Sequence, residues 1–256
     1  MSEPARTNVI AFGAHPDDVE IFAGGTVCSL VQHGYRVGIV DLTEGELGSR
    51  GSRELRSKES AAATEIMGVA FRENLGLSDG HIENSLGNRN LIIEVLRRHR
   101  PDILLIPAAE CRHPDHGAAS TLISEAAFYS GLRKIIVSTG PADTSRSERA
   151  WRPAHILHYM QSIPFEPTVV VDVSFVWEQR MNAVLAYHSQ VFDPTYEKGH
   201  DEPETFVSNP GFVKWIEARA RAFGYRIGAE YGEPFLYRHG PLGTSDIVRF
   251  LGQDSP

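Results

Sequence analysis

The sequence predicts an α/β protein built on a doubly wound, mostly parallel sheet with helices on both faces. Two observations lead to this fold class. Short apolar runs alternate with longer amphipathic segments, which is the pattern of repeated strand–helix units. In addition, the run at residues 102–106 (DILLI) is apolar almost throughout, as expected of a strand that is covered by helices on both sides.

The predicted strands are short and apolar, and most end in polar or glycine-rich segments. The segment 8–13 (NVIAFG) is predicted to be a buried strand and 36–42 (RVGIVDL) a second one. The third predicted strand, 69–75, has the weakest strand pattern of the set. In chain order, the predicted strands are 8–13, 36–42, 69–75, 102–106, 155–160 and 168–173.

The predicted helices carry apolar residues three and four positions apart, and several end at a glycine or before a proline. The first spans 17–33 and ends at Gly34. The second follows the polar loop 44–53 and ends at Gly68, and the third is closed by Pro101. Further helices are predicted at 117–130, 175–188 and 210–227.

No segment has the composition of a linker between domains, so residues 1–256 are predicted to form one domain. Its core occupies about residues 8–130. The polar segment 138–152 is predicted to be a mobile loop. The back half, about residues 150–250, is expected to extend the sheet and to cap the site.

Composition excludes several classes of protein. The 256 residues are 41% hydrophobic and 23% charged, as in an ordinary globular protein, and no run approaches the ~18 apolar residues of a membrane span. The polar N-terminus and the two cysteines, Cys28 and Cys111, lead us to expect a reducing, cytoplasmic location. A net charge of −8 argues against nucleic acid or an anionic membrane as the partner.

The chain carries a His-Pro-Asp motif twice. The first copy follows the strand at 8–13, the second follows the strand at 102–106, and each opens a helix. Both therefore lie at the carboxyl ends of parallel strands, where open α/β sheets bind ligands. In the common strand order 3-2-1-4-5 the first and fourth strands are neighbours, so the motifs should meet in one cleft. The two copies are His15-Pro16-Asp17-Asp18 and His113-Pro114-Asp115-His116.

Together the motifs offer three histidines and three aspartates, which are nitrogen and oxygen ligands of the kind that zinc accepts. A hydrolytic zinc site uses three protein ligands and keeps one position for water, so two histidines and one aspartate would complete it. The remaining side chains could then transfer protons. The alternative is that the histidines merely cap two helices. The pairing of both motifs at one cleft argues against that alternative.

These motifs resemble those of the LmbE/PIG-L family of zinc-dependent N-deacetylases, which have a Rossmann-like fold. A wider similarity, over about residues 8–245, is to the branch that deacetylates N-acetylglucosaminyl malate in bacillithiol biosynthesis. The resemblance implies one Zn²⁺ per chain, although another divalent metal is compatible, and a homo-oligomer, either a trimer or a hexamer. The segments that carry it outside the motifs are 43–51 (TEGELGSRG), 54–56 (ELR), 74–77 (NLGL), 187–190 (YHSQ) and 231–233 (YGE).

The resemblance also divides roles among the motif residues. Asp17 matches the general base of the family. His113 matches the residue that stabilises the oxyanion or donates a proton, and Asp115 matches the orienting partner of that histidine. The zinc ligands that the resemblance implies are His15, Asp18 and His116.

Four arginines lie in or beside the loops that follow the second and fourth strands: Arg50, Arg53, Arg56 and Arg112. A dicarboxylate such as malate needs planar, bidentate partners, which arginine supplies. Arg56 and Arg112 match positions that the bacillithiol branch places at its substrate site, and Arg50 is a further substrate-binding candidate. Arg53 is expected to be a solvated surface residue. Gln190 is a further candidate for contact with the sugar, the alternative being packing at a helix end.

The expected function is therefore removal of the acetyl group from a small N-acetylglucosaminyl conjugate, of which the malate adduct is the first candidate. An inositol conjugate or a chitooligosaccharide is an alternative aglycone. A non-catalytic metal-binding module is disfavoured because Asp17 and His113 are not needed merely to hold zinc. A nucleotide-binding module lacks its glycine motif. Cys111 is interpreted as a small packing residue, because a lone cysteine near a histidine is usually a buried hydrophobe.

Overall fold

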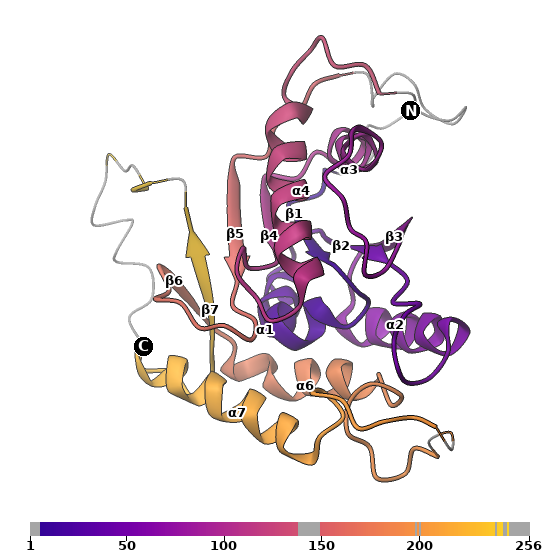
Figure 1. Cartoon of the computed structure of the whole chain (residues 1–256). Helices are drawn as coiled ribbons and strands as arrows, with labels where there is room; N and C mark the ends of the chain where they lie inside the picture. The colour runs from indigo at the N-terminus through magenta and orange to yellow at the C-terminus, as the bar shows by residue number, and fades with distance from the viewer. Residues whose placement is uncertain are drawn as a thin grey trace.

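A seven-stranded sheet runs through the centre of the molecule (Figure 1). The computed structural model describes residues 6–137, 149–197, 199, 201–238, 240–242 and 245. The strands are β1 (Val9–Gly13), β2 (Val37–Thr43), β3 (Phe71–Leu77), β4 (Ile103–Ile106), β5 (His155–Tyr159), β6 (Val169–Asp172) and β7 (Gly232–Tyr237). Their order across the sheet is β3-β2-β1-β4-β5-β7-β6.

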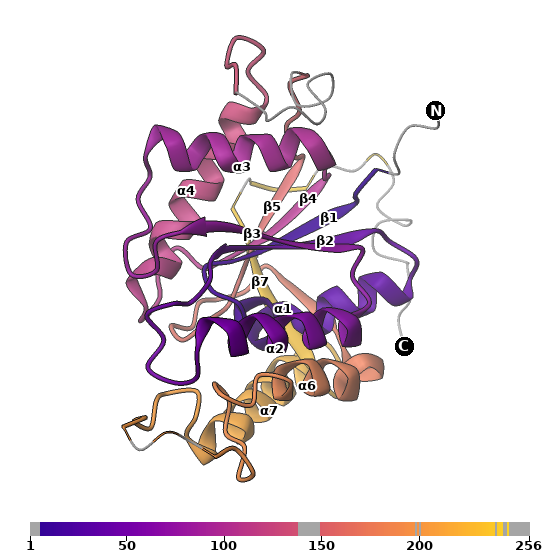
Figure 2. The ribbon, with the colours of Figure 1, turned by 90° about the vertical axis from the view of Figure 1, so that its right-hand side faces the viewer.

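Helices cover both faces of this sheet, as the sequence predicts. The helices are α1 (Asp18–Gln32), α2 (Arg53–Met67), α3 (Leu86–His99), α4 (Pro114–Ser130), α6 (Trp177–Leu185) and α7 (Pro210–Tyr225), with a 3-10 turn η1 (Ser174–Val176) before α6. Figure 2 shows α3 and α4 on one face, and α1, α2, α6 and α7 on the other. A separate apolar core lies on each face. None of the helices in the described ranges is long and apolar enough to span a membrane.

Helix α2 ends at the glycine that the sequence predicts, and serine side chains cap the starts of α2 and α3. The Ser52 hydroxyl accepts a hydrogen bond from the Leu55 amide and caps the start of α2. At its other end, Gly68 has φ 70°, a left-handed conformation that suits glycine because it has no Cβ. The Ser85 hydroxyl caps α3 in the same way. The chain therefore turns back into the sheet soon after α2 and α3, since β3 begins at Phe71 and β4 at Ile103.

The parallel half of the sheet confirms the predicted strand order. β1 pairs in parallel with β2 on one side and with β4 on the other, so the first and fourth strands are neighbours. β3 lies two residues later in the chain than the predicted 69–75. The helix predicted at 175–188 is shorter, because the chain forms η1 first and leaves the helix after Leu185. Of the loop predicted at 138–152, residues 138–148 lie outside the described residues.

The sequence pattern does not predict β7, which lies between β5 and β6 and pairs antiparallel with both. Its sequence, GEPFLY, contains a proline and a charge and lacks the run of β-branched residues that marks a strand. Tertiary contacts hold it instead. The Glu233 carboxylate accepts hydrogen bonds from the Gly25 and Thr26 amides within α1, at 2.8 and 2.7 Å. The sheet is thus mixed, because its strands are antiparallel at the end that lies opposite β3.

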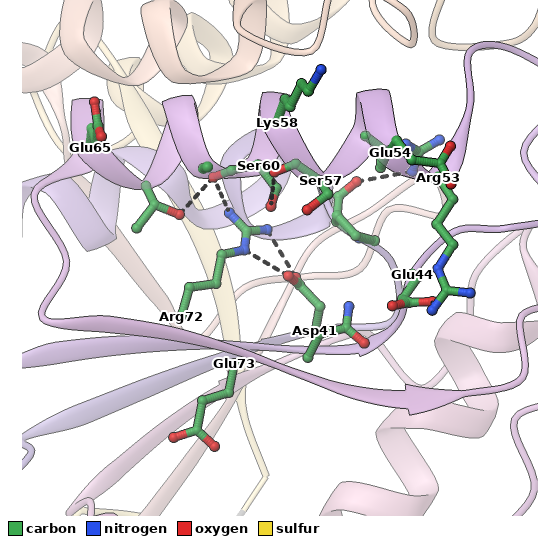
Figure 3. Close-up of a pocket in the computed structure, with 15 residues that line it drawn as sticks. Asp41, Glu44, Arg53, Glu54, Ser57, Lys58, Ser60, Glu65, Arg72 and Glu73 are labelled. Atoms are coloured by element: carbon green, nitrogen blue, oxygen red, sulfur yellow. Dashed lines mark hydrogen bonds and ion pairs between the residues drawn. The ribbon is translucent and has the colours of Figure 1, made fainter.

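A buried ion network links β2, β3 and α1 beneath the first motif. Arg72 Nε lies 2.6 Å from Asp41 Oδ2 (Figure 3), and its Nη1 lies 2.5 Å from Glu20 Oε1. All three side chains are buried. The Tyr187 hydroxyl donates a further hydrogen bond to Glu20, at 3.0 Å. Asp41 lies beside Gly13 and Asp18. The network therefore supports the backbone of the segment that carries the first motif.

Arg72→Met is expected to destabilise the protein, because it leaves two buried carboxylates without their cation. Breaking a buried ion pair in this way costs about 3–5 kcal/mol. Equilibrium unfolding in urea measures the change. Arg53→Met is the matched control, since Arg53 forms an exposed pair with Glu44 and should unfold at the wild-type midpoint. Equal midpoints for the two variants would contradict a supporting role for the network.

Candidate metal and catalytic site

The two His-Pro-Asp motifs meet at one edge of the sheet. The first occupies the turn between β1 and α1, and the second opens α4 after β4. Because β1 and β4 are adjacent and parallel, both turns emerge at the same edge. The ring centres of His15 and His113 are 4.8 Å apart, those of His113 and His116 are 5.1 Å apart, and those of His15 and His116 are 5.5 Å apart.

Two imidazoles and one carboxylate within this cluster fit a metal ion. His116 Nε2 lies 3.1 Å from Asp18 Oδ1, and His15 Nδ1 lies 3.5 Å from Asp18 Oδ2. One ligand atom from each of these buried residues lies within 4.8 Å of the other two, which is close enough for one ion to bind all three. Burial favours the neutral carboxyl, yet the charge and hydrogen bonds of the two histidines hold the pKa of Asp18 well below its usual value.

The backbone of Asp17 is strained, which is a common feature of residues at functional sites. It is the N-cap of α1 with φ 124°, a conformation that residues with a Cβ rarely adopt. Its Oδ2 lies 3.7 Å from Arg56 Nη1. Burial raises the pKa of Asp17 to about 7, and the Arg56 guanidinium opposes this rise. A carboxylate that titrates near neutral pH can both accept and return a proton.

His113 is oriented by the backbone of its own helix. As the N-cap of α4, its Nδ1 accepts a hydrogen bond from the Asp115 amide at 3.3 Å, which leaves Nε2 as the protonated nitrogen. Burial and the neighbouring His15 and His116 lower its pKa, so that the neutral form predominates at pH 7. A neutral, half-buried imidazole with a fixed N–H is suited to donate a hydrogen bond to a developing negative charge.

The role of Asp115 as the orienting partner of His113 stays a prediction, and the hydrogen bond between the two residues comes from the backbone of Asp115. The backbone amide of Asp115 contacts His113, whereas its carboxylate points elsewhere. Asp115 Oδ2 accepts a hydrogen bond from the Gly80 amide at 2.7 Å and lies 3.3 Å from His15 Nε2. The reason is that Asp115 lies in the first turn of α4, where its side chain reaches toward the loop after β3.

A cavity of about 420 Å³ opens over these residues. Its lining includes the three histidines and the two aspartates of the first motif. The lining is also partly apolar, since Leu47 and Phe206 belong to it with 64% and 44% of their surfaces exposed. Ionisable side chains and an apolar surface for a ring or alkyl group are therefore both available to one ligand. The other lining residues are Ile21, Phe22, Gly45, Gly48, Ser49, Arg56, Asp79, Cys111, Arg112, Ser162, Gln190, Thr205 and Val207.

Three of the four predicted substrate residues line this cavity. Arg112 is exposed, and its guanidinium lies 4.8 Å from the centre of the Phe206 ring. Arg56 is buried, and its Nη1 donates a hydrogen bond to the Pro16 carbonyl at 3.1 Å. Gln190 lines the cavity and also donates to the Arg50 carbonyl at 2.8 Å.

Arg50 is not among the lining residues. Its Nε donates a hydrogen bond to the Ser189 carbonyl at 2.8 Å, and its guanidinium lies over the Tyr196 ring. Arg50 therefore joins the loop after β2 to the segment after α6. The expectation that it binds substrate is not supported by its position, because that side chain is already engaged in this contact.

A larger cavity, of about 760 Å³, lies between α2 and the strands β2 and β3 (Figure 3). Four of its charged groups form two ion pairs with one another. Arg72 contacts Asp41, and Arg53 contacts Glu44. None of the three clustered histidines lines it. We therefore assign the catalytic chemistry to the smaller cavity.

Sequence reasoning missed or misjudged four residues of the site. Cys111 is not an apolar packing residue, because its Sγ lies 3.0 Å from His116 Nδ1 and 3.0 Å from the Ser162 hydroxyl. Asp79 lines the cavity and contacts His15. It stands two residues beyond β3, so the strand-end rule that selected both motifs would have found it. Ser162 and Phe206 come from the back half of the chain and carry no motif.

Comparisons with known proteins agree with this site. The family model described as PIG-L, GlcNAc-PI de-N-acetylase, matches residues 10–127, a range that includes both motifs. The chain is 34% identical to the conserved protein TT1542 from Thermus thermophilus, with a TM-score of 0.80 over 93% of this chain and 98% of that one.

Two curated relatives are named as deacetylases. Diacetylchitobiose deacetylase from Thermococcus kodakarensis is 30% identical over 74% of this chain and 72% of its own length. The probable N-acetyl-alpha-D-glucosaminyl L-malate deacetylase 2 from Bacillus cereus is 26% identical over 82% of this chain and 94% of its own. Given the identity to the first relative and the extent that it covers, this chain belongs to the PIG-L family of de-N-acetylases and is an amide hydrolase.

Proposed function

We propose that this protein is a zinc-dependent deacetylase that removes the acetyl group from an N-acetylglucosaminyl conjugate. The observation that carries the proposal is the meeting of His15, Asp18 and His116 beside Asp17 and His113. The first three form a ligand set, and the other two are a base and a hydrogen-bond donor. Holding a metal ion alone would require only the ligand set.

The ligand set suits zinc. Two imidazole nitrogens and one carboxylate oxygen are common zinc ligands, and the cavity leaves room for water and substrate beside them. When bound, zinc supplies Lewis acidity, which polarises the amide carbonyl and makes water more acidic. The same ligands also accept other divalent ions, so metal analysis of the purified protein must identify the ion.

The protein side chains then carry out the proton transfers. Asp17 accepts the proton of the attacking water, because its raised pKa makes it a base matched to neutral pH. His113 Nε2–H donates a hydrogen bond to the oxygen that becomes negative as the acetyl carbon turns tetrahedral. The departing amine then takes a proton from Asp17 or His113, since an amide nitrogen leaves poorly without one.

The substrate that we propose is the malate conjugate of N-acetylglucosamine. Arg112 supports this choice because it stands exposed at the cavity and, among the residues described, has no carboxylate within ion-pair distance. An arginine held on an aromatic ring presents its planar edge to a carboxylate. A chitooligosaccharide is the second candidate, favoured by the exposed Leu47 and Phe206 side chains and by the 30% identical relative.

The first prediction concerns the metal. Zinc-loaded protein should contain about one ion per chain, and His116→Ala should lose it, because that change removes one of three protein ligands. Elemental analysis after gel filtration measures the occupancy. Cys111→Ser is the control, since serine keeps a hydrogen-bonding group beside His116. Full occupancy in His116→Ala would exclude this ligand set.

The second prediction separates the base from the ligand. Asp17→Asn is nearly isosteric and should keep the metal while turnover falls by about 10²–10⁴-fold, the usual contribution of a general acid–base group. Acetate release and metal content are measured on the same preparation. If Asp17→Asn loses the metal and Asp18→Asn keeps it, the two carboxylates have exchanged roles.

The third prediction concerns the aglycone. Arg112→Ala should raise KM for the malate conjugate by roughly 10- to 150-fold, the loss expected for one charge-assisted contact, and affect a neutral methyl N-acetylglucosaminide much less. Arg56→Ala should impair both substrates, because Arg56 contacts Pro16 and lies beside Asp17. Equal effects of Arg112→Ala on both substrates would refute the malate assignment.

A further inference from the structure

The imidazole of His116 has different partners on its two nitrogens. Its Nε2 lies 3.1 Å from Asp18 Oδ1, within the proposed ligand set. Its Nδ1 lies on the other edge of the ring, where Cys111 Sγ is at a hydrogen-bonding distance of 3.0 Å. The ring is buried, with 10% of the side chain exposed. No step of the proposed reaction uses the thiol.

We propose that Cys111, held by Ser162, is a positioning residue, whose sulfur accepts the Nδ1–H of His116 and thereby presents Nε2 to the metal. A neutral imidazole carries one N–H, so the acceptor on one nitrogen determines which nitrogen has the free lone pair. Such a partner also orients the ring and raises its basicity toward a metal. This inference rests on the metal site of the proposed function, and on no property of the substrate.

The position of Asp18 indicates which nitrogen of His116 the metal takes. Two ligand atoms on one tetrahedral zinc ion, each at about 2.0–2.2 Å from it, lie roughly 3.4 Å apart. The 3.1 Å between His116 Nε2 and Asp18 Oδ1 is close to that separation. Nε2 must then offer its lone pair, which leaves the single proton of the neutral ring on Nδ1. That N–H faces the sulfur of Cys111.

Ser162 holds the sulfur in place. Its hydroxyl oxygen accepts a hydrogen bond from the Arg112 amide at 3.0 Å and lies 3.0 Å from Cys111 Sγ. Either the hydroxyl or the thiol can donate in the second contact, and in both cases the sulfur keeps a lone pair for His116. Cys111 follows β4 and Ser162 follows β5, and these two strands are parallel neighbours. The contact therefore ties the thiol to an adjacent strand end.

Two other roles for this thiol fit the geometry less well. A cysteine that only fills apolar space would be fully buried, whereas Cys111 is partly exposed and lines the cavity. A thiolate that binds the metal itself would lie on the Nε2 side of His116. The sulfur instead lies against Nδ1, and Cys111 belongs to neither group of described residues whose ligand atoms cluster.

Four substitutions separate the hydrogen bond from the mere loss of a thiol. Cys111→Ala removes the acceptor, whereas Cys111→Ser keeps a smaller one beside His116. Ser162→Ala keeps the thiol and removes its support. Cys28→Ala is the matched control, because Cys28 is the other cysteine of the chain, is buried in α1 and does not line the cavity.

The experiment is Zn²⁺ binding by metal-free protein in competition with a chromogenic chelator, without substrate. Cys111→Ala should raise the zinc dissociation constant about 10- to 100-fold, the usual effect of losing such a partner. Cys111→Ser and Ser162→Ala should raise it clearly less, and Cys28→Ala should remain near wild type. Nitrogen NMR of the zinc-loaded wild type should show His116 protonated at Nδ1 only.

Four results would overturn the inference. They are an unchanged zinc affinity in Cys111→Ala, an equal loss in Cys28→Ala, a zinc-loaded His116 protonated at Nε2, and a sulfur-to-cobalt charge-transfer absorption in the Co²⁺-loaded wild type that Cys111→Ser abolishes. The last result would make Cys111 a metal ligand. Thermal unfolding of each variant shows whether it is folded.

The same assay separates this inference from the proposed function. Because no substrate enters it, a failed deacetylase assay leaves the result intact. A wild type that binds no zinc would refute the metal site, and with it both the proposed function and the role of Cys111. Tight zinc binding by the wild type with unchanged affinity in Cys111→Ala would refute the role of Cys111 alone.

Discussion

The site depends on the parallel pairing of β1 with β4. The two motifs are almost a hundred residues apart, and only adjacent, parallel strands bring the turns that follow them to the same edge. β1 ends at Gly13 and α1 begins at Asp18, whereas β4 ends at Ile106 and α4 begins at Pro114. The segments that carry His15 and His116 therefore start from positions that the backbone hydrogen bonds of the sheet set.

The second constraint on this structure is the burial of the charged side chains at the site. The site gathers carboxylates and imidazoles where solvent is largely excluded, and each must find a partner because an isolated buried charge is unstable. Asp18 is stabilised by the histidines, Asp17 has Arg56 nearby, and Asp41 has Arg72. The arrangement leaves Asp17 least stabilised as an anion. Its raised pKa and its strained backbone are the properties expected of a proton acceptor.

Loop residues also line the cavity. The loops after β2 and before α7 contribute Leu47 and Phe206, and the segment just before α4 contributes Arg112, which lies beside Phe206. In the proposed reaction, residues in the turns after β1 and β4 act on the acetamide, whereas loop residues contact the rest of the substrate. This separation is consistent with relatives that bear the names of deacetylases for different sugar conjugates.

The sequence by itself determined the strand–helix alternation, the neighbouring positions of the first and fourth strands, and the clustering of both motifs. These follow from local periodicity and from a topological rule, and both operate on short segments. Only the tertiary structure decided the rest. β7 has no strand pattern of its own and depends on Glu233 reaching α1. Asp115 turns to His15, and Cys111 to His116, because contacts across the loop after β3 and with Ser162 set their directions. Side-chain direction at a helix start depends on partners distant in sequence, which periodicity does not encode.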